Sequence, residues 1–389
     1  MLNAAKEQVK ALLTAAAAGG GEGFVSAARE DLAQLLACDD EEPAVEWVGS
    51  GDDFVVFSLA RHFALRFPKT PDAATWLQRE EQLFPVIAPL LFTAASTSVP
   101  IHLVLIPSSL SCNASSSSSS STPVDTPSLC YPFPWVLYKL IHGRQGYRTL
   151  HPEEVEGLAE TMGQLLGALH SVAAERVAAI ADPSRGHDSW DPSAYRRTVV
   201  EDLLEEGCES DPPLTGTPLE VLLGMGLAPD LARLAADLLD PAATEAPPAL
   251  ADRGWERLVH GDLDPEHVLL GASGGVEGII DWSDARVGDP VRDLAAMFSW
   301  GGISFLERLL LHYPVHLLDP GAPLRLPFLA RLCSLDGWFS TRGGPTHDSA
   351  HALLRNAFGY CPSDTSSPSL LHQLPLRLSA AFDLASSQR

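Results

Sequence analysis

The chain has 389 residues, of which 46% are hydrophobic, so it is long enough to bury more than one substantial core. Its 50 acidic residues outnumber its 26 basic residues and give a formal net charge of −24. This acidity argues against nucleic acid and anionic membrane as partners, because both require a basic surface, and it would suit a cationic small molecule.

The cysteine spacing argues against a zinc or redox motif, and the length of the apolar runs argues against a membrane-spanning segment. The six cysteines are scattered and show no Cys-x-x-Cys spacing, which is typical of free thiols in a reducing compartment. An alanine-rich run at residues 12–18 is short and lacks a convincing cleavage site, and no stretch is long enough to span a bilayer. We therefore expect a cytoplasmic protein.

The first predicted elements are short amphipathic helices, and we assign residues 1–40 to a helical N-terminal extension. Next, an apolar run, a turn that contains Gly49 and Gly51, and a second apolar run predict a β-hairpin over residues 45–57. A Gly-x-Gly turn alone is a weak signal for a phosphate-binding loop.

A strand is expected over residues 62–69, with Arg66 at its centre. An amphipathic helix is expected over residues 72–91, with Glu80 and Glu81 in its middle. For Arg66, the alternative to a functional role is an edge-strand side chain that faces solvent.

A serine-rich insert interrupts the next two predicted strands, at residues 101–106 and 134–138. The insert covers about residues 107–128 and has the composition of a disordered segment.

Helical periodicity dominates the rest of the chain. The helix expected at residues 152–172 carries His170, which we interpret as a helix-end cap. Further helices are expected at residues 190–250 and 305–384. Two interpretations stay open for the acidic cluster of the first of these regions, a wall for a cationic acceptor or a solvated helix face. The cluster consists of Glu201, Asp202, Glu205, Glu206 and Glu209.

The most informative stretch is residues 260–281, where His260-Gly-Asp262 is followed by His267 and by two short apolar runs around a glycine-rich turn. These runs predict a β-hairpin, which brings Asp281 at its exit back to Asp262 and His267 at its entrance.

Two carboxylates and a histidine in one place fit a site of phosphoryl transfer. That chemistry needs one carboxylate to orient the attacking hydroxyl and accept its proton, and further ligands for the Mg²⁺ that neutralises the triphosphate. The His-x-Asp loop gives the first role to Asp262, whereas His267 and Asp281 occupy the positions of kinase metal ligands. An imidazole is a softer donor than Mg²⁺ prefers. We interpret His260 and Asp289 as structural residues.

The residues 260–290 resemble the signature of the aminoglycoside phosphotransferase family, in the sequence His-Gly-Asp-Leu-x-Pro-x-His-Val-Leu and, later, Ile-Asp-Trp-Ser-Asp-Ala-Arg-Val-Gly-Asp-Pro. Within the family, the motif is most similar to macrolide 2′-phosphotransferases and aminoglycoside 2″-phosphotransferases. The resemblance implies a bilobal, protein-kinase-like α+β fold. The small lobe, residues 41–139, would hold an antiparallel sheet plus a helix, and the larger, mainly helical lobe would occupy residues 140–389, with the catalytic loop at 260–267.

The resemblance also implies roles in the small lobe. Arg66 stands where kinases carry their phosphate-binding Lys, with Lys69 as the fallback, and the family's Arg-Glu-x-x-Leu pattern selects Glu80 as its partner and leaves Glu81 in solvent.

Nucleotide contacts are expected from two further places in that lobe. Gly49 and Gly51 would cover the phosphates, and main-chain groups around Tyr138 and Leu140 would hold the base of ATP or GTP.

Three functions remain open. The first is an O-kinase that uses Mg²⁺ and ATP or GTP to phosphorylate a hydroxyl of an aminoglycoside or macrolide-like acceptor, which would confer antibiotic resistance. The second is the same reaction on a metabolite such as an amino alcohol, sugar or nucleoside. The third is a nucleotide-binding pseudokinase. A protein kinase is disfavoured, because Trp282 and Ser283 follow Asp281 where Phe-Gly is usual.

Overall fold

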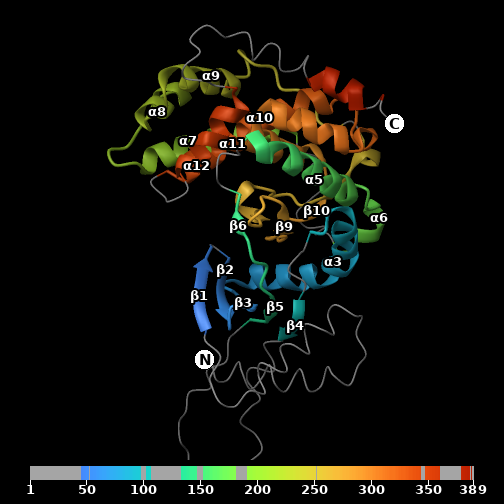
Figure 1. The fold of residues 1–389 in the computed structure, drawn as a ribbon. Coiled ribbons are helices and arrows are strands. Elements are labelled where there is room, and N and C mark those ends of the chain that lie inside the picture. The colour runs from blue at the N-terminus through green and yellow to red at the C-terminus, as the bar shows by residue number, and fades with distance from the viewer. Residues whose placement is uncertain are drawn as a thin grey trace, which may run out of the picture. The chain divides into compact units, whose positions relative to one another are not determined.

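The computed structural model describes residues 45–51, 53–97, 102–106, 133–146, 152–180, 191–250, 252–342, 347–359, 378–385 and 387. The expected N-terminal extension and serine-rich insert lie outside the described residues. By its contacts the chain divides into two compact units (Figure 1). The first comprises residues 1–89 and 98–142, and the second comprises residues 90–97 and 143–389.

The first unit contains one antiparallel sheet in the order β1-β2-β3-β5-β4. Its strands are β1 (Val45–Ser50), β2 (Phe54–Leu59), β3 (Phe63–Pro68), β4 (His102–Ile106) and β5 (Trp135–Lys139). The predicted β1–β2 hairpin is confirmed, with Val45 opposite Leu59.

Helix α3 (Pro71–Ala95) packs against this sheet. Ala73 and Leu77 of α3 form a buried cluster with Phe54 of β2 and Val136 of β5. The predicted helix over residues 72–91 is therefore confirmed, and its apolar side covers the sheet.

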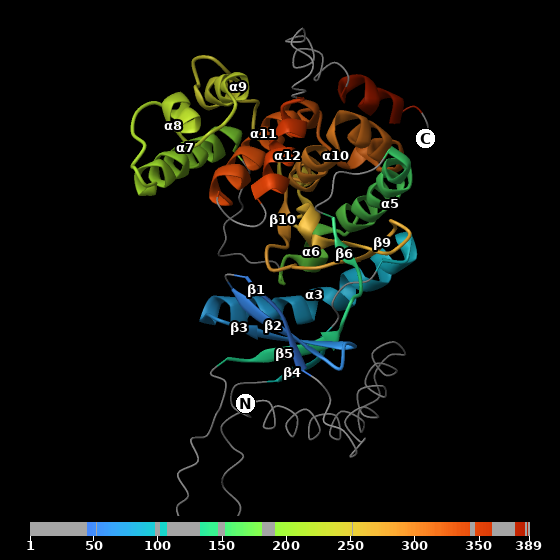
Figure 2. The ribbon, with the colours of Figure 1, turned by 60° about the vertical axis from the view of Figure 1, so that its left-hand side comes forward.

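The second unit is mainly helical (Figure 2). Its helices are α5 (Pro152–His170), α6 (Ala174–Val177), α7 (Pro192–Glu209), α8 (Pro218–Gly224), α9 (Pro229–Leu239), α10 (Val291–His312), α11 (Ala322–Ser340) and α12 (His347–Ala357). Its short strands are β6 (Arg144–Gln145), β7 (Arg257–Val259), β8 (Val268–Leu270), β9 (Val276–Ile279) and β10 (Arg286–Gly288). Single turns of 3₁₀-helix lie at Arg253–Trp255, Pro265–His267 and Val315–Leu317.

Local sequence explains several helix starts. Helix α8 begins at a capping box in which Thr217 accepts from the main-chain N–H of Glu220, and the Glu220 carboxylate accepts from that of Thr217. Helix α7 begins with Pro192 after Asp191, whose side chain accepts from the N–H of Ser193.

Helix α10 forms the core of the second unit and packs against α5, α11 and α12. Among the described residues it is the single helix long and apolar enough to cross a membrane, but 56% of that apolar window is buried inside the protein. Such burial is typical of a core helix.

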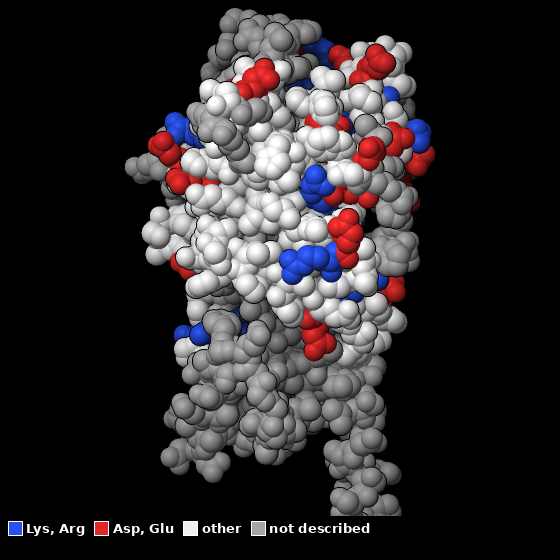
Figure 3. Space-filling view, turned by 90° about the vertical axis from the view of Figure 1, so that its right-hand side faces the viewer, with Lys and Arg blue, Asp and Glu red and all other residues white. Residues whose placement is uncertain are grey.

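In the second unit, the aromatic side chains of Trp338, Phe339 and Phe358 are all buried. On the face drawn in Figure 3, the Lys and Arg side chains of the described residues are interspersed with Asp and Glu and form no continuous basic patch.

Candidate active site

The loop that carries Asp262 follows strand β7 and makes a turn that only glycine fits at residue 261. Gly261 has a φ of +87°, and a Cβ atom there would lie 2.4 Å from the carbonyl oxygen of Asp284. Glycine therefore lets the chain pass this carbonyl without strain. The turn leaves the Asp262 side chain 47% exposed.

Asp293, at the start of α10, binds the backbone of this loop. Its carboxylate accepts hydrogen bonds from the main-chain N–H groups of His260 (2.8 Å) and Gly261 (3.0 Å), and it lies 3.1 Å from Nε2 of His170. Burial by itself raises the pKa of Asp293, but the hydrogen bond and charge of His170 outweigh it, so the pKa lies below its usual range. Asp293 is thus a buried acceptor that fixes the loop backbone.

The prediction that His170 caps its helix is wrong. Its other ring nitrogen, Nδ1, lies 2.8 Å from the hydroxyl of Tyr313, and its side chain is fully buried. His170 therefore links Asp293 to Tyr313, because both of its nitrogens face side chains of distant segments rather than the last carbonyls of α5.

The ring of His260 also holds this loop in place, as predicted. Its Nε2 donates to the carbonyl oxygen of Ile280 at 3.0 Å, and its Nδ1 accepts from the N–H of Asp262 at 3.3 Å. Burial lowers the pKa of His260. The neutral ring is consistent with one donating and one accepting nitrogen.

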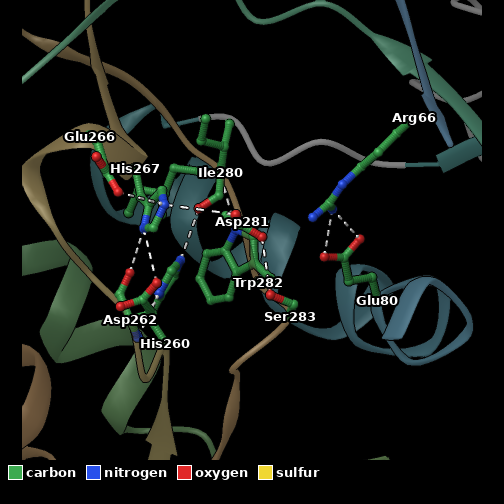
Figure 4. A network of polar contacts seen from close by, with 11 residues as sticks. Arg66, Glu80, His260, Asp262, Glu266, His267, Ile280, Asp281, Trp282 and Ser283 are labelled. Atoms are coloured by element: carbon green, nitrogen blue, oxygen red, sulfur yellow. Dashed lines mark hydrogen bonds and ion pairs between the residues drawn. The ribbon is translucent and has the colours of Figure 1, made fainter. Parts of the chain in front are cut away.

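Strands β8 and β9 form the predicted hairpin and bring the three candidate groups together (Figure 4). Val268 lies opposite Ile279, and the N–H of Ile280 continues the pairing to the carbonyl oxygen of His267 at 2.9 Å. As a result, Oδ2 of Asp281 lies 3.7 Å from Nε2 of His267. The predicted convergence is confirmed.

The His267 ring turns its Nε2 atom toward two carboxylates. Its Nδ1 lies 2.6 Å from the carbonyl oxygen of Asp262, which can only accept, so Nδ1 carries a proton, and in the neutral ring Nε2 keeps its lone pair. Nε2 faces the carboxylates of Asp281, at 3.7 Å, and Glu266, at 3.6 Å. Burial lowers the pKa of His267, but the charges of Asp262 and Asp281 outweigh burial and raise it.

These residues fit a divalent cation that is completed by other ligands. Within the described ranges, no group of three or more His, Cys, Asp or Glu side chains is placed to hold a metal alone. Mg²⁺ is commonly held by one or two protein ligands together with substrate phosphates and water. Ser283 donates to Oδ1 of Asp281 at 3.1 Å and so restrains this carboxylate.

In the first unit, Arg66 and Glu80 form the predicted ion pair (Figure 4). Nη1 of Arg66 lies 2.9 and 3.0 Å from the two carboxylate oxygens of Glu80, and both side chains are buried. The guanidinium also stacks 3.6 Å above the centre of the Phe54 ring. The edge-strand alternative is wrong, because β3 lies between β2 and β5. As expected, Glu81 is exposed.

The other residues predicted in that unit occupy the sheet and its ends. Gly49 pairs with Val56 within the hairpin, and the N–H of Gly51 donates to the carbonyl oxygen of Phe54. The carbonyl oxygen of Gly51 accepts from Lys69, the fallback cation.

Tyr138 and Leu140 lie at the end of β5. Tyr138 is half-buried and pairs with Ala64 of β3, and the N–H of Leu140 donates to the carbonyl oxygen of His62 at 2.8 Å.

Sequence reasoning missed a pocket of about 240 Å³ in the second unit that opens beside Asp262. Its walls come from the catalytic loop and from helices α7, α10, α11 and α12, and its polar lining residues include Tyr195, Asp262, Asp264, Glu266, Arg292 and Asp336. Tyr195 and Asp336 are 141 positions apart, so no local pattern could have joined them. None of the five residues of the predicted acidic cluster lines it, and four of the five are exposed, which favours the solvated helix face.

Because the pKa of Asp293 is lowered in the folded protein, its carboxylate raises the free energy of unfolding at neutral pH and contributes less as the pH falls. A carboxylate with a lowered folded-state pKa stabilises the protein above its unfolded pKa, which is about 3.9, and loses this contribution as the pH falls. We expect Asp293→Asn to be less stable than the wild type at pH 7, and the difference to narrow below about pH 4. Urea unfolding midpoints of both proteins from pH 7 to pH 3 test this, and a constant difference would contradict it.

Comparisons with known proteins identify the family of this chain. The model of a family described as "Phosphotransferase enzyme family" matches residues 48–324. Viomycin phosphotransferase from Streptomyces vinaceus is 30% identical over 163 residues, which are 41% of this chain and 47% of that protein. Uncharacterized protein YcbJ from Bacillus subtilis (strain 168) is 40% identical over 60 residues, which are 15% of this chain and 20% of that protein. The matches thus span less than half the length of these relatives.

One solved structure supports the fold. The GDP and kanamycin complex of an APH(2″) enzyme has a TM-score of 0.50 at 18% identity, and the match covers 82% of this chain and 95% of that one. At this identity the similarity concerns the fold alone. Together with the antiparallel sheet, the helix α3 and the mainly helical second unit, it confirms the predicted protein-kinase-like α+β fold.

Proposed function

Since this chain belongs to the phosphotransferase enzyme family, we propose that it is a small-molecule O-kinase that transfers the γ-phosphoryl group of ATP or GTP to a hydroxyl of an aminoglycoside or macrolide-like acceptor. The observation that carries this proposal is the placement of Asp262, His267 and Asp281 within one hydrogen-bonded loop and hairpin. One carboxylate is exposed there and a second lies beside the His267 ring, so the site offers a group to orient a hydroxyl and candidate metal ligands, the two parts that phosphoryl transfer uses.

Asp262 is the group that orients the acceptor hydroxyl and accepts its proton. Its carboxylate is exposed to the pocket, whereas its backbone is held by His260 and by the loop that Asp293 anchors. Burial raises the pKa of Asp262, and the neighbouring His267 opposes that rise. A carboxylate with a raised pKa is a better base for the hydroxyl proton than an ordinary surface aspartate.

His267 and Asp281 would hold Mg²⁺ through Nε2 and a carboxylate oxygen. When bound, the cation neutralises charge on the triphosphate. The proton on Nδ1 keeps the His267 ring in the orientation that presents its lone pair, because Nδ1 donates to the carbonyl oxygen of Asp262.

In the first unit, Arg66 would bind phosphate oxygens while Glu80 holds its side chain in place. Nη1 of the guanidinium pairs with both carboxylate oxygens of Glu80, and the planar fork of donors in a guanidinium suits the oxygens of a phosphate. Gly49 and Gly51 would cover the phosphates, and the main chain near Leu140 would hold the base.

An antibiotic acceptor is supported by the names of similar proteins, one a viomycin phosphotransferase and one solved with kanamycin. The test is consumption of ATP or GTP by the purified chain with Mg²⁺ across aminoglycosides, macrolides, viomycin and simple amino alcohols, sugars and nucleosides. We expect acceptor-dependent turnover and a product that is heavier by one phosphoryl group. Turnover on a metabolite alone would move the function to a metabolic kinase, and nucleotide binding without turnover would favour a pseudokinase.

The metal assignment predicts that Asp281→Ala weakens binding of the Mg²⁺-nucleotide complex by roughly tenfold or more, because one of two protein ligands is lost. Titration of a fluorescent nucleotide with and without Mg²⁺ measures this. Glu277→Ala is the matched control, because Glu277 is an exposed carboxylate on strand β9 of the same hairpin. Equal Mg²⁺-dependent affinity in Asp281→Ala and wild type would refute the metal role.

A further inference from the structure

Gly337, in the last turn of helix α11, has no structural reason to be glycine. Glycine destabilises a helix relative to alanine. Gly337 is not the cap of α11, which is Thr341, and its φ does not lie in the left-handed region. Apart from its two neighbours and its own helix backbone, no heavy atom of the described residues lies within 4 Å of the place where its Cβ would be. Neither conformation nor packing therefore requires glycine here.

Other helix glycines of the second unit differ from Gly337 in this respect. A Cβ atom on Gly163, Gly167 or Gly207 would lie 2.5, 2.6 or 2.8 Å from an atom of another segment, so these glycines allow close packing. Beside Gly337 lies the pocket that opens next to Asp262. The free energy that glycine costs helix α11 thus creates space in this pocket.

Gly337 lies in the middle of the face that α11 presents to the pocket. Cys333, Ser334 and Thr341 of the same helix also line the pocket, and their spacing places all four residues on one side of the helix. A side chain at position 337 would therefore extend into the pocket. The space is limited, because the volume of about 240 Å³ is below the roughly 300–1,000 Å³ of pockets that enclose a drug-sized ligand. It suits one ring of an acceptor rather than a whole antibiotic.

The polar lining near Gly337 suits a ring that carries hydroxyl groups. The hydroxyls of Ser299, Ser334 and Thr341 lie 3.0, 2.7 and 2.7 Å from the carbonyl oxygens four residues earlier in their helices, and Ser334 also lies 2.7 Å from the hydroxyl of Ser299. Their protons are used inside the protein, whereas each oxygen keeps a lone pair that can accept from a ligand hydroxyl. Ala350 and Leu353 add apolar surface for the carbon atoms of a ring.

We propose that Gly337 is a specificity-determining residue that, by lacking a side chain, makes room for one hydroxylated ring of the acceptor to pack against α11. The inference rests on the proposed function and narrows it to acceptors whose reacting hydroxyl belongs to such a ring, a sugar or a cyclitol. Asp262, which lines the same pocket, engages the reacting hydroxyl of that ring.

The test fills this space with Gly337→Ala and Gly337→Leu. Gly157 of α5 provides the matched controls, Gly157→Ala and Gly157→Leu, because it is exposed and its Cβ would likewise meet no heavy atom within 4 Å among the described residues. A threonine hydroxyl one turn later donates to each glycine carbonyl, from Thr161 to Gly157 at 2.9 Å and from Thr341 to Gly337 at 2.7 Å. Urea unfolding gives the stability of each full-length variant.

Calorimetry with Mg²⁺ and a non-hydrolysable nucleotide gives the affinity of each variant for kanamycin and for the macrolide erythromycin. We expect both alanine variants to raise the urea midpoint, because alanine favours a helix. For whichever antibiotic the wild type binds, Gly337→Ala should weaken binding roughly tenfold, as for one extra methyl group in a filled pocket, and Gly337→Leu should abolish it. Both Gly157 variants should bind as the wild type does.

Three results would overturn the inference. The first is a wild type that binds neither antibiotic, the second is a Gly337→Leu variant that binds as the wild type does, and the third is a Gly337→Ala variant with a lowered urea midpoint, which would make the glycine structural. Turnover assays separate the two proposals. Binding that Gly337→Leu abolishes, in a protein without turnover, would leave the ring site standing and remove the kinase. Wild-type turnover with an unchanged KM in Gly337→Leu would do the reverse.

Discussion

Replacing Asp262 with Ala is expected to abolish acceptor phosphorylation, with a fall in kcat of roughly 10²-fold to 10⁴-fold, while nucleotide affinity changes little. The reason is that the Asp262 carboxylate is exposed to the pocket, where it can meet a hydroxyl, whereas the proposed site assigns the metal to His267 and Asp281. Single-turnover kinetics with the best acceptor and a separate nucleotide titration measure the two quantities.

Asp230→Ala controls for the loss of an acidic side chain from the same unit, because Asp230 is 75% exposed on helix α9. Retained turnover in Asp262→Ala would remove Asp262 from the role of base. A parallel loss of nucleotide affinity would instead give it a share in binding the metal.

Replacing Arg325 with Leu is expected to destabilise the second unit by about 3–5 kcal/mol, because it leaves two buried carboxylates without their partner. Nε of Arg325 lies 2.8 Å from Oδ2 of Asp289, its Nη1 lies 2.9 Å from Oδ2 of Asp319, and its side chain is fully buried. This triad ties the start of α11 to the turn that precedes α10. Urea unfolding followed by circular dichroism measures the change.

Arg233→Leu provides a matched control for burial. Its Nη1 lies 2.9 Å from Asp230, a separation close to those in the Arg325 triad, but its side chain is 66% exposed. Exposed pairs contribute little to stability, so this variant should unfold at almost the wild-type urea concentration. If the two variants lose equal stability, burial is not what makes the Arg325 triad important.

The features that could be predicted from the sequence are those that a short stretch of residues determines by itself. The β8–β9 hairpin followed from two apolar runs around glycines, and the convergence of Asp281 with His267 followed from the hairpin. The Arg66–Glu80 pair was also predicted, but through the family pattern rather than through periodicity, since nothing local distinguishes Glu80 from Glu81.

Features that depend on packing between distant segments escaped prediction. His170 bonds to Tyr313 and Asp293, which lie 143 and 123 positions further along the chain, so a helix-end histidine was mistaken for a cap. The pocket beside Asp262 likewise needs α7 and α11 to meet the catalytic loop.

The turn at residues 271–275 closes the hairpin at the end opposite to His267 and Asp281. The N–H of Gly271 donates to the carbonyl oxygen of Gly275 at 2.8 Å, so a hydrogen bond joins the two ends of the turn next to the strands. Lengthening a loop costs little free energy, about 0.6 kcal/mol for each doubling. This turn is therefore a suitable place to insert an epitope or a fluorophore-binding tag, which would report on the hairpin without displacing His267 or Asp281 of the proposed site.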